Sequence, residues 1–446
     1  MANEWREIPL DDLCSYLNRG TAPAYTDGGG VLVLNQKCVR DQRVTLGEAR
    51  RTDPKRKPIA KERFLQPFDI LVNSTGVGTL GRVAQVRTLP ETATVDSHMT
   101  IVRPNSNAID PSYLGLAVRY SEAEIESLGE GSTGQTELSR ARLGALLVPV
   151  PKREDQRAIA CILGALDDKI ELNREMNQTL EATARAIFKS WFVDFDPVRA
   201  KAVGQKPPRL KPGIAALFPD SFNDSELGEI PKGWSVTSLA DQITASKGLS
   251  YKGQHLCEPG EGLPMHNLNS VYEGGGYKRE GLKWYNGEHR PAHLLKPGDV
   301  IVTNTEQGFD YLLIGYSAIV PDCYGPQGLF SHHIFRIRPK STSYLPAWFT
   351  YLLLRTQRFH DLVAGHSNGT TVNMLPLDGL QKPTFALPPE ALVKRFEALF
   401  LPAHQRIERI HEENASLAAI RDALMPKLIS GELVVAEAER IAGRCT

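Results

Sequence analysis

Four pairs of matching segments divide this 446-residue chain into two copies of one plan. The paired segments start at Trp5 and Trp234, Leu65 and Leu295, Ser97 and Ser331, and Ser132 and Ser367. Their order is the same in both copies, and the offset between partners stays within 229 to 235 residues. Because a repeat constrains architecture before local propensity does, the pattern predicts two similar domains. Segments such as FDILVNST and LGALLVPVP indicate that these domains are rich in β-strands.

A long helix is predicted after each copy. In the first helix, apolar or Asn side chains recur at alternating steps of four and three residues: Ile159, Leu163, Leu166, Ile170, Asn173, Asn177, Leu180, Ala184, Ile187 and Trp191. The same steps recur 237 residues later, from Phe396 to Leu428. A 3.5-residue period sustained for so long indicates a heptad seam between helices. The alternative is that each helix is amphipathic and lies on its own domain.

These patterns predict an α+β chain of six segments. They are a β-rich domain over 1–151, a helix over 152–196, a Pro-rich linker over 197–232, a β-rich domain over 233–388, a helix over 389–431 and a tail over 432–446. The prolines of KPPRLKPGIAALFPD should make the linker semi-rigid.

Composition excludes several classes of protein. No apolar run approaches the roughly 18 residues that a membrane span needs, and the six cysteines lack C-x-x-C spacing, so we expect a cytoplasmic chain without a zinc site or disulfide framework. The 52 basic and 52 acidic residues cancel, but nine Lys or Arg face four acids between Arg40 and Arg63. Such a run is either a solvated surface or a nucleic-acid contact.

The stretch GVGTLG, Gly76 to Gly81, matches the G-x-G-x-x-G fingerprint of dinucleotide-binding loops. That fingerprint requires a strand before it and a helix after it. The sequence that follows, RVAQVRTLPETATV, alternates and is rich in Val and Thr, which favours a second strand. We therefore predict a glycine-bearing bend between paired strands, where small residues let the backbone approach a partner.

Four segments carry a resemblance to the specificity subunit of type I restriction and modification enzymes. They are VLNQKCVRDQRV (33–44), GSTGQTELSRARLGALLVPVPKREDQRAIACILGALDDKI (131–170), AIFKSWFVDFDPVRAK (186–201) and LFPDSFNDSELGEIPKGW (217–234). The resemblance covers nearly the whole chain. It implies two target recognition domains that each read one half of a split DNA site. It also implies that the two helices form an antiparallel coiled coil that separates these domains.

The resemblance also implies partners. Two methyltransferase subunits should dock on the coiled coil, restriction subunits should join the full complex, and S-adenosylmethionine, ATP and Mg should bind these partners rather than this chain. In the family an acid-Gln pair opens each helix. Asp155 and Gln156 match it in the first helix, but Val393 stands opposite Gln156 in the second, so that half of the partner surface should differ.

The heptads predict one register for an antiparallel coil. With Asn177 and Asn414 at a positions, Asn173 is at a d position and should face Asn414. A buried Asn pair penalises slipped registers, because each amide would then face hydrocarbon. In this register only Leu166 against Arg421 is mismatched, and we expect the Arg stem to lie along Leu166 while its head reaches water.

DNA readers need Arg, Lys, Ser or Thr for phosphates and Arg, Lys, Asn or Gln for base edges. The candidates in the first copy are Arg19, Thr21, Asn35, Gln36, Lys37, Arg40, Arg43, Asn73, Ser74, Thr75, His98, Thr133, Gln135 and Thr136. Their counterparts in the second copy are Lys247, Ser250, Tyr251, Lys252, His266, Asn267, Asn269, Asn304, Thr305, Gln307, His332, Asn368 and Thr370. For the Asn, Ser and Thr side chains the alternative is the capping of turns, and His98 and His332 could equally be core residues.

Two other functional classes stay open. The chain has no Asn-Pro-Pro-aromatic or Asp-Pro-Pro-aromatic methyltransferase box and no P-loop, so we expect a non-catalytic subunit. A self-contained methyltransferase or nuclease with an unfamiliar site is one alternative. A coiled-coil adaptor that binds only proteins is the other.

Overall fold

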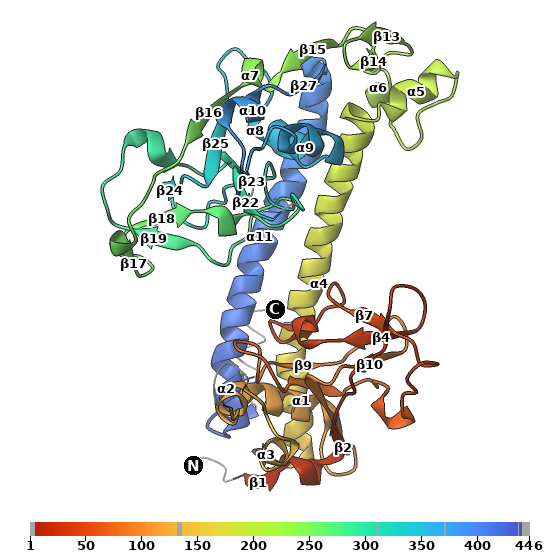
Figure 1. Cartoon of the computed structure of the whole chain (residues 1–446), viewed down its shortest axis with the longest axis vertical. Helices are drawn as coiled ribbons and strands as arrows, with labels where there is room; N and C mark the ends of the chain where they lie inside the picture. Colours follow the sequence, from red (N-terminus) through yellow and green to blue (C-terminus); the bar gives the residue numbers. More distant parts are fainter. Residues whose placement is uncertain (1–4, 132–135, 309, 370–371, 436, 439–446) are drawn as a thin grey trace. The chain divides into compact units, whose positions relative to one another are not determined.

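The computed structural model describes residues 5–131, 136–308, 310–369, 372–435 and 437–438 (Figure 1). The chain divides into two compact units: unit 1 is Met1–Arg174 with Glu413–Thr446, and unit 2 is Glu175–Glu412. Both contain helices and sheets, so the fold is α+β as predicted. The borders between the units fall inside the two long helices, whereas the sequence pattern placed its borders at the ends of the β-rich domains.

The two long helices are α4 (Arg153–Phe192) and α11 (Glu390–Ile429), each of 40 residues. A helix of this length is about 60 Å long at 1.5 Å per residue. In unit 1, Ile159 of α4 and Leu424 of α11 are buried in one hydrophobic cluster with side chains of the β-rich part. In unit 2, Trp191 packs edge to face on Phe396, with 5.7 Å between ring centroids. The apolar faces of both helices therefore contribute to the core of each unit.

Four polar side chains lie along the predicted heptad seam. The amide of Asn173 donates to the side-chain oxygen of Asn414 at 2.9 Å in unit 1, and the amide of Asn177 donates to the backbone oxygen of Ile407 at 3.4 Å in unit 2. The sequence pattern placed the head of Arg421 in water. In the structure the side chain is 15% exposed, and its head donates to Asp167 at 2.9 Å and pairs with Asp422.

Unit 1 is built on two four-stranded sheets. The first has the antiparallel order β2 (Cys14–Arg19), β11 (Met99–Pro104), β8 (Ile70–Asn73) and β9 (Val83–Gln85). The second has the order β10 (Ala93–Val95), β4 (Val31–Leu34), β7 (Arg50–Thr52) and β3 (Tyr25–Thr26), in which β10 and β4 are parallel. The smaller elements are β1 (Arg6–Pro9) paired with β12 (Leu147–Val150), the hairpin β5 (Val39–Arg40) and β6 (Arg43–Val44), and helices α1 (Pro111–Tyr120), α2 (Glu122–Ser127) and α3 (Arg140–Gly144).

Unit 2 contains a four-stranded sheet of the same antiparallel kind. Its order is β16 (Ile243–Lys247), β25 (Ile334–Pro339), β21 (Val300–Thr303) and β23 (Ser317–Ile319). A five-stranded sheet has the order β17 (Leu256–Cys257), β19 (Lys283–Tyr285), β18 (Leu263–His266), β24 (Gly328–Phe330) and β20 (Leu294–Leu295). The remaining elements are β15 (Ser235–Ser238) paired with β27 (Thr384–Leu387), β22 (Thr305–Gln307) paired with β26 (Val372–Met374), and helices α7 (Leu239–Gln242), α8 (Ala347–Leu354), α9 (Gln357–Ala364) and α10 (Leu377–Gln381).

One ion pair with a buried carboxylate occurs at the same place in both antiparallel sheets. In unit 1, Arg103 of β11 donates through Nε and Nη2 to the two carboxylate oxygens of Asp69, both at 2.8 Å. In unit 2, Arg338 of β25 binds Asp299 through the same two nitrogens. Both acids also accept from a backbone N–H three residues earlier, at 2.8 and 2.9 Å. Two-point binding of this kind fixes the angle between a strand and the turn before its neighbour.

The segment expected to be a semi-rigid linker, 197–232, is folded. It carries most of α5 (Asp196–Ala202), α6 (Pro212–Ala215) and the hairpin of β13 (Phe222–Ser225) and β14 (Gly228–Pro231). Val198 and Phe218 are 0% and 1% exposed and belong to the main hydrophobic cluster of unit 2. The prolines led to the prediction of a linker, but that prediction was wrong. The apolar residues between the prolines are buried, and their burial stabilises a folded segment.

The GVGTLG stretch is a loop between the paired antiparallel strands β8 and β9, as predicted. Gly76, Gly78 and Gly81 have φ values of 99°, 73° and 86°, which side chains with a Cβ adopt rarely. The strand β9 follows, so the helix N-terminus that a dinucleotide needs is not there. Within the described residues, no helix has the length and apolar character to cross a membrane.

Candidate nucleic-acid interface

In unit 1, three side chains from distant segments meet beside the end of β8. The hydroxyl of Thr75 lies 2.8 Å from Nδ1 of His98 and 3.4 Å from the side-chain oxygen of Gln36. Asn73, the last residue of β8, donates its amide to the backbone oxygen of Gln36 at 2.9 Å and so holds this loop in place. His98 is exposed, whereas Thr75 and Gln36 are half-buried. The loops before β11, after β8 and after β4 thus form one polar surface.

Arg19 joins a fourth segment to this surface. Its guanidinium pairs with Glu137 and donates to the backbone oxygens of Ser74 and Leu138 at 3.3 and 2.6 Å. Through these bonds Arg19 connects the loop after β8 with the segment that contains Glu137, and its guanidinium is occupied by these partners. Ser74 is fully buried and its hydroxyl lies 2.6 Å from that of Thr100. Arg19 and Ser74, two of the predicted contacts, therefore position the surface from within.

The basic loop of unit 1 is a tight hairpin, β5 and β6. Asp41 and Gln42 at its tip have φ values of 51° and 60°, which fits the two-residue hairpin turn that follows the twist of the strands. Arg40 is exposed and pairs with no acid among the described residues. Arg43, in contrast, forms an ion pair with Glu171 of α4. Only Arg40 of these two arginines is free for a ligand.

The loop before this hairpin shows turn chemistry. Asn35 accepts from the backbone N–H of Lys37 at 2.8 Å and donates to the backbone oxygen of Glu48. It therefore caps a turn, the alternative that the sequence left open. Lys37 is exposed and lies 3.7 Å from the carboxylate of Glu48. Thr21 and Thr136 are half-buried, while Thr133 and Gln135 lie outside the described residues.

Unit 2 repeats the hydroxyl and imidazole contact with a different histidine. The hydroxyl of Thr305 lies 3.0 Å from Nδ1 of His333, whereas the sequence match had named His332. The backbone hydrogen bonds give the same correspondence. The N–H of Ser74 donates to the backbone oxygen of His98 at 2.8 Å, and the N–H of Asn304 donates to that of His333 at 3.1 Å. His98 therefore corresponds to His333, and the match of SHMTIVRP with SHHIFRIRP was wrong by one residue at its start.

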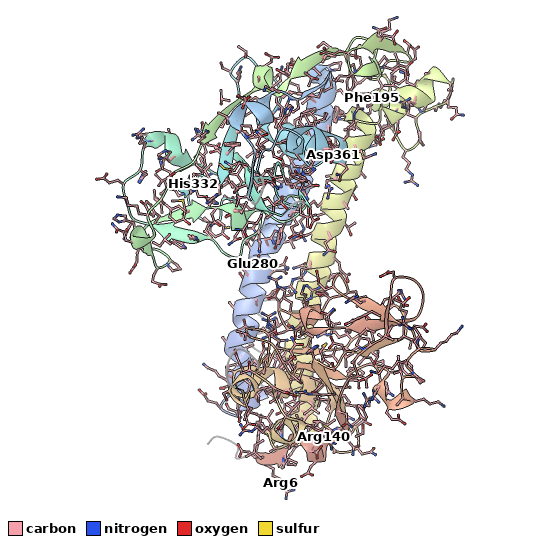
Figure 2. The ribbon with its side chains drawn as sticks, in the orientation of Figure 1. Arg6, Arg140, Phe195, Glu280, His332 and Asp361 are labelled. Carbon is pink, nitrogen blue, oxygen red and sulfur yellow. The ribbon has the colours of Figure 1, made fainter. Side chains whose placement is uncertain are left out.

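The histidine missed by the sequence comparison has a distinct environment. His333 is half-buried, and its ring lies 3.9 Å from the ring of His332 between centroids. Burial and the neighbouring His332 lower the pKa of His333, in that order of size. His332 is exposed and is labelled among the strands of unit 2 in Figure 2. The two adjacent histidines made either alignment plausible in the sequence.

Several predicted contacts of unit 2 are buried. His266 is 1% exposed, its Nδ1 lies 2.7 Å from the hydroxyl of Tyr277, and burial lowers its pKa to about 4. Asn267 is 5% exposed and accepts from the backbone N–H of Asn269 at 2.8 Å. Asn304 donates its amide to the oxygen of His332 at 3.0 Å. His266 is thus a core residue, and Asn267 and Asn304 shape loops.

Other predicted contacts of unit 2 are accessible. Lys247, Ser250, Lys252, Asn269, Gln307 and Asn368 are exposed. Tyr251 is half-buried, and its hydroxyl accepts from the ammonium of Lys283 at 2.7 Å. Neither Lys247 nor Lys252 pairs with an acid among the described residues. Thr370 lies outside the described residues.

Comparison with known proteins shows which proteins this chain resembles. A model of the type I restriction modification DNA specificity domain matches residues 2–182. The chain is 25% identical, over 97% of its length and 100% of the relative, to the type I restriction enzyme HindI specificity subunit of Haemophilus influenzae. Residues 2–182 thus match the type I restriction modification DNA specificity domain, and the whole chain is similar to type I restriction enzyme specificity subunits.

Two further similarities point to the same kind of protein. The chain is 26% identical to the type I restriction enzyme MjaIX specificity subunit of Methanocaldococcus jannaschii, over 70% of this chain and 66% of the relative. Its fold resembles the crystal structure of a type I restriction-modification S subunit from M. genitalium, with a TM-score of 0.55 at 16% identity over 96% of both chains. The latter likeness supports the fold alone.

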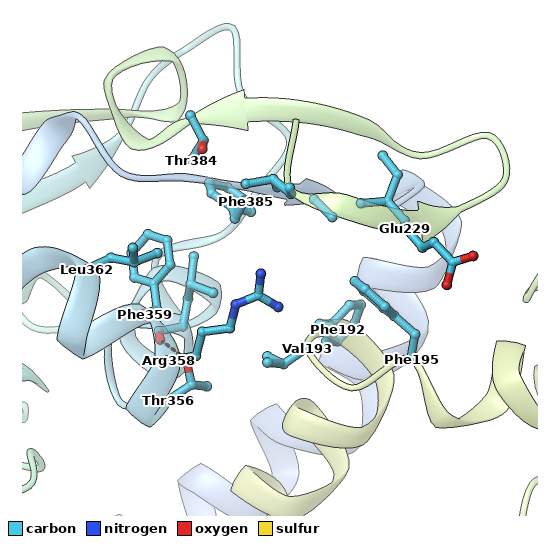
Figure 3. A pocket seen from close by; sticks show the side chains of 14 residues that line it. Phe192, Val193, Phe195, Glu229, Thr356, Arg358, Phe359, Leu362, Thr384 and Phe385 are labelled. Carbon is cyan, nitrogen blue, oxygen red and sulfur yellow. Dashed lines mark hydrogen bonds between the residues drawn. The ribbon is translucent and has the colours of Figure 1, made fainter. Parts of the chain in front are cut away.

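Two hollows of unit 2 lie away from these polar loops. One, shown in Figure 3, has a volume of about 70 Å³ and is lined by Phe192, Phe359 and Phe385, with Arg358 pointing toward its centre. Its volume is far below the roughly 300 Å³ of a small-molecule site. The other has a volume of about 480 Å³ and carries Arg185, Lys189 and Arg355.

The larger hollow is basic. Arg355 forms an ion pair with Glu181, and Lys189 pairs with Asp194. Arg185 forms no ion pair among the described residues. Burial and the nearby Arg355 lower its pKa, and the charge of Glu181 acts in the opposite direction. No group of three or more side chains in the described part of the chain is arranged to hold a metal ion.

Proposed function

We propose that this chain is the sequence-specific DNA-binding subunit of a type I restriction-modification complex and that each β-rich domain reads one half of a bipartite target. The observation that carries this proposal is the recurrence of one framework with different exposed residues. Thr75 and His98 in unit 1 match Thr305 and His333 in unit 2 at 2.8 and 3.0 Å. A shared scaffold that presents different side chains suits the reading of two different half-sites.

The accessible candidates divide into two chemical groups. Arg40, Lys247 and Lys252 are exposed cations and suit phosphate or guanine contacts. Gln36, Gln307 and Asn269 are amides that suit base edges. Because the chain has no net charge, attraction to DNA must come from these local cations rather than from the whole molecule.

We further propose that methyltransferase subunits dock on the long helices and that restriction subunits join through them. Leu172 of α4 and Leu399 of α11 are 55% and 43% exposed, and exposed apolar side chains on a helix suit a protein partner. Arg185 at the basic hollow suits an acidic residue of such a partner. Gln156 is not available to a partner, because it is 2% exposed. Its side chain accepts from the backbone N–H of Asp110 at 2.8 Å and donates to the backbone oxygen of Pro151 at 2.9 Å. It fixes the β-rich domain of unit 1 on the start of α4.

In this proposal the partners carry out the chemistry and bind S-adenosylmethionine, ATP and Mg. A self-contained methyltransferase or nuclease would instead modify or cut DNA without them, and an adaptor would bind no DNA. Methylation assays of the purified chain with and without methyltransferase subunits separate these cases. We expect methyl transfer only in the assembled complex, and transfer by the chain alone would contradict the proposal.

A gel shift with random-sequence duplexes tests DNA binding, followed by sequencing of the bound fraction. We expect the assembled complex to enrich a split motif. Exchange of residues 1–151 for the matching domain of a relative should change one half of the motif and leave the other intact. A change in both halves would contradict reading by separate domains.

A further inference from the structure

The exposed face of unit 2 beside Thr305 is a two-stranded ribbon, β22 and β26. In this antiparallel pair Thr305 stands opposite Met374 and Gln307 stands opposite Val372. Residues directly opposite share one face of a pair, so these four side chains lie on one face. Thr305 is 4% exposed at its inner edge, and the other three side chains are exposed. Met374 and Val372 are 55% and 43% exposed. Two apolar side chains therefore lie exposed beside the amide of Gln307.

The other face of the ribbon is anchored to the interior. Glu306 is 6% exposed, and its carboxylate accepts from the backbone N–H groups of Leu312, Leu313 and Ile314 at 2.8, 3.0 and 2.9 Å. Asn373, opposite Glu306, is 3% exposed and donates its amide to the oxygen of Gly308. A ribbon held from beneath presents its outer side chains in fixed positions, which recognition of a rigid duplex requires.

Unit 1 has the same backbone arrangement. Glu137 exchanges backbone hydrogen bonds with Glu130 at 2.7 and 2.9 Å, as Met374 does with Asn368 at 2.8 and 2.9 Å. Gly131 and Gly369 follow Glu130 and Asn368 with φ values of 150° and 151°. Glu137 therefore corresponds to Met374. Ser132, which the sequence pattern matched with Ser367, lies outside the described residues.

The corresponding positions differ in chemistry. In unit 1 the acid Glu137 forms an ion pair with Arg19. Arg19 ends the first strand of its sheet opposite Thr100, and Lys247 ends the first strand of its sheet opposite Phe335. Lys247 therefore corresponds to Arg19. In unit 2 the two positions of the ion pair hold Met374 and Lys247. Unit 2 has thus replaced a charged pair by an apolar side chain and an exposed lysine.

We propose that the outer face of the β22 and β26 ribbon reads thymine through its 5-methyl group in the half of the target that unit 2 binds. The major groove admits a two-stranded ribbon, and the thymine methyl is the apolar group that base pairs present there. Met374 and Val372 supply the apolar contact, and Gln307 supplies an amide for a neighbouring base edge. Lys247 suits an adjacent phosphate. This inference rests on the proposed function and adds the base chemistry to it.

The test uses the full chain assembled with its methyltransferase subunits. The target is first determined by mapping the bases that the complex methylates. Each thymine of a target duplex is then replaced in turn by deoxyuridine, which lacks only the methyl group, and affinity is measured by competition at fixed salt. We expect the replacement of at least one thymine to lower affinity about fourfold, the effect of removing one buried methyl group.

The variants assign that effect to the ribbon. In Met374→Ala the ratio of affinities for thymine and deoxyuridine at the sensitive position should fall to about one, with Val372→Ala as the alternative if Val372 makes the contact. Met374→Leu should keep the preference. Val203→Ala removes another exposed apolar side chain of unit 2 and should leave the ratio unchanged.

Three results would overturn the inference: no thymine is sensitive to loss of its methyl, the preference survives in both ribbon variants, or Met374→Ala prevents assembly with the partners, which would make the ribbon a protein contact. Failure of the proposed function looks different. In that case the unaltered complex would prefer no duplex over a scrambled one.

Discussion

Asn173 on α4 donates a hydrogen bond of 2.9 Å to the side-chain oxygen of Asn414 on α11. Asn173 is fully buried, and its own side-chain oxygen has no partner among the described residues. Asn414 in turn donates to the backbone oxygen of Ile170 at 3.4 Å. A buried amide pair that is only partly satisfied costs stability, and its advantage is that it penalises other registers of the two helices.

We therefore predict that one substitution in this pair lowers stability and that a second substitution restores most of it. Asn173→Leu should lower the free energy of unfolding by about 1 to 3 kcal/mol, because Asn414 loses its side-chain partner in an apolar seam. The double variant Asn173→Leu with Asn414→Leu should recover most of this loss. Chemical denaturation of all four proteins in a double-mutant cycle measures the coupling. Additive effects of the two substitutions would contradict a direct interaction.

The register also has a functional consequence in the proposed complex. A slip of one heptad would move one helix along the other by about 10 Å. The double variant lacks the register penalty. A complex assembled with it should therefore methylate targets with a wider range of spacer lengths. Sequencing of methylated sites from a spacer library tests this. An unchanged spacer preference would mean that other contacts set the register.

The duplicated ion pair predicts a loss of stability in both units, and the larger loss in unit 1. Asp69 and Asp299 are 0% and 3% exposed, so Arg103→Met or Arg338→Met leaves a buried carboxylate without its ion pair. We expect a loss of about 3 to 5 kcal/mol for Arg103→Met, whose side chain is 14% exposed. The loss for Arg338→Met should be smaller, because that side chain is 36% exposed and solvent screens the pair. Arg51→Met breaks a surface ion pair with Glu91 and should have the smallest effect. Thermal unfolding of the three variants distinguishes these outcomes.

The buried His266 predicts a loss of stability in mild acid. Burial lowers its folded-state pKa to about 4, whereas an unfolded histidine titrates near 6.5. Its contribution is complete above about pH 6.5 and declines as the pH falls toward 4, because the unfolded chain binds a proton that the folded chain excludes. Between pH 6.5 and 5 this amounts to about 2 kcal/mol.

Urea denaturation at several pH values tests this contribution. His266→Asn should reduce the slope of stability against pH over that window. His366→Asn, which removes an exposed histidine, is the control, and the slope should fall less in it than in His266→Asn. Since burial also lowers the pKa of His333, His404 and His411, a residual slope is expected in both variants. Equal slopes in His266→Asn and the unaltered chain would contradict the prediction.

Long-period patterns in the sequence located much of the scaffold. The heptad steps placed Asn173 opposite Asn414, the atoms of which are in contact, and the strands on both sides of GVGTLG pair as expected. These predictions succeeded because they rest on many positions that must agree. The register error at His98 arose where one extra histidine gave two alignments of equal quality, and only the backbone bond from Asn304 to His333 decides between them.

Individual site residues were harder to predict. Asn35, Asn267 and Asn304 had the residue type of base contacts, but the hydrogen bonds of their side chains shape loops. A side-chain amide recognises a backbone group and a base edge with the same atoms, so composition alone does not separate the two roles. Met374 was overlooked for the opposite reason. It has no polar group, and only its exposed position on the ribbon draws attention to it.

The hairpin arginine gives a prediction about salt dependence. Arg40 is exposed without an acidic partner among the described residues, whereas Lys37 lies 3.7 Å from Glu48. Arg40→Ala should therefore weaken binding of the assembled complex to its target more than Lys37→Ala does. If Arg40 contacts a base, the loss is about 1 to 3 kcal/mol and is confined to specific DNA. If it contacts a phosphate, binding to all sequences weakens, and the slope of log affinity against log salt becomes shallower by about one.

The control for this prediction is Arg51→Ala, which removes an arginine that is paired with Glu91. Unchanged affinity in both Arg40→Ala and Lys37→Ala would remove this loop from the interface.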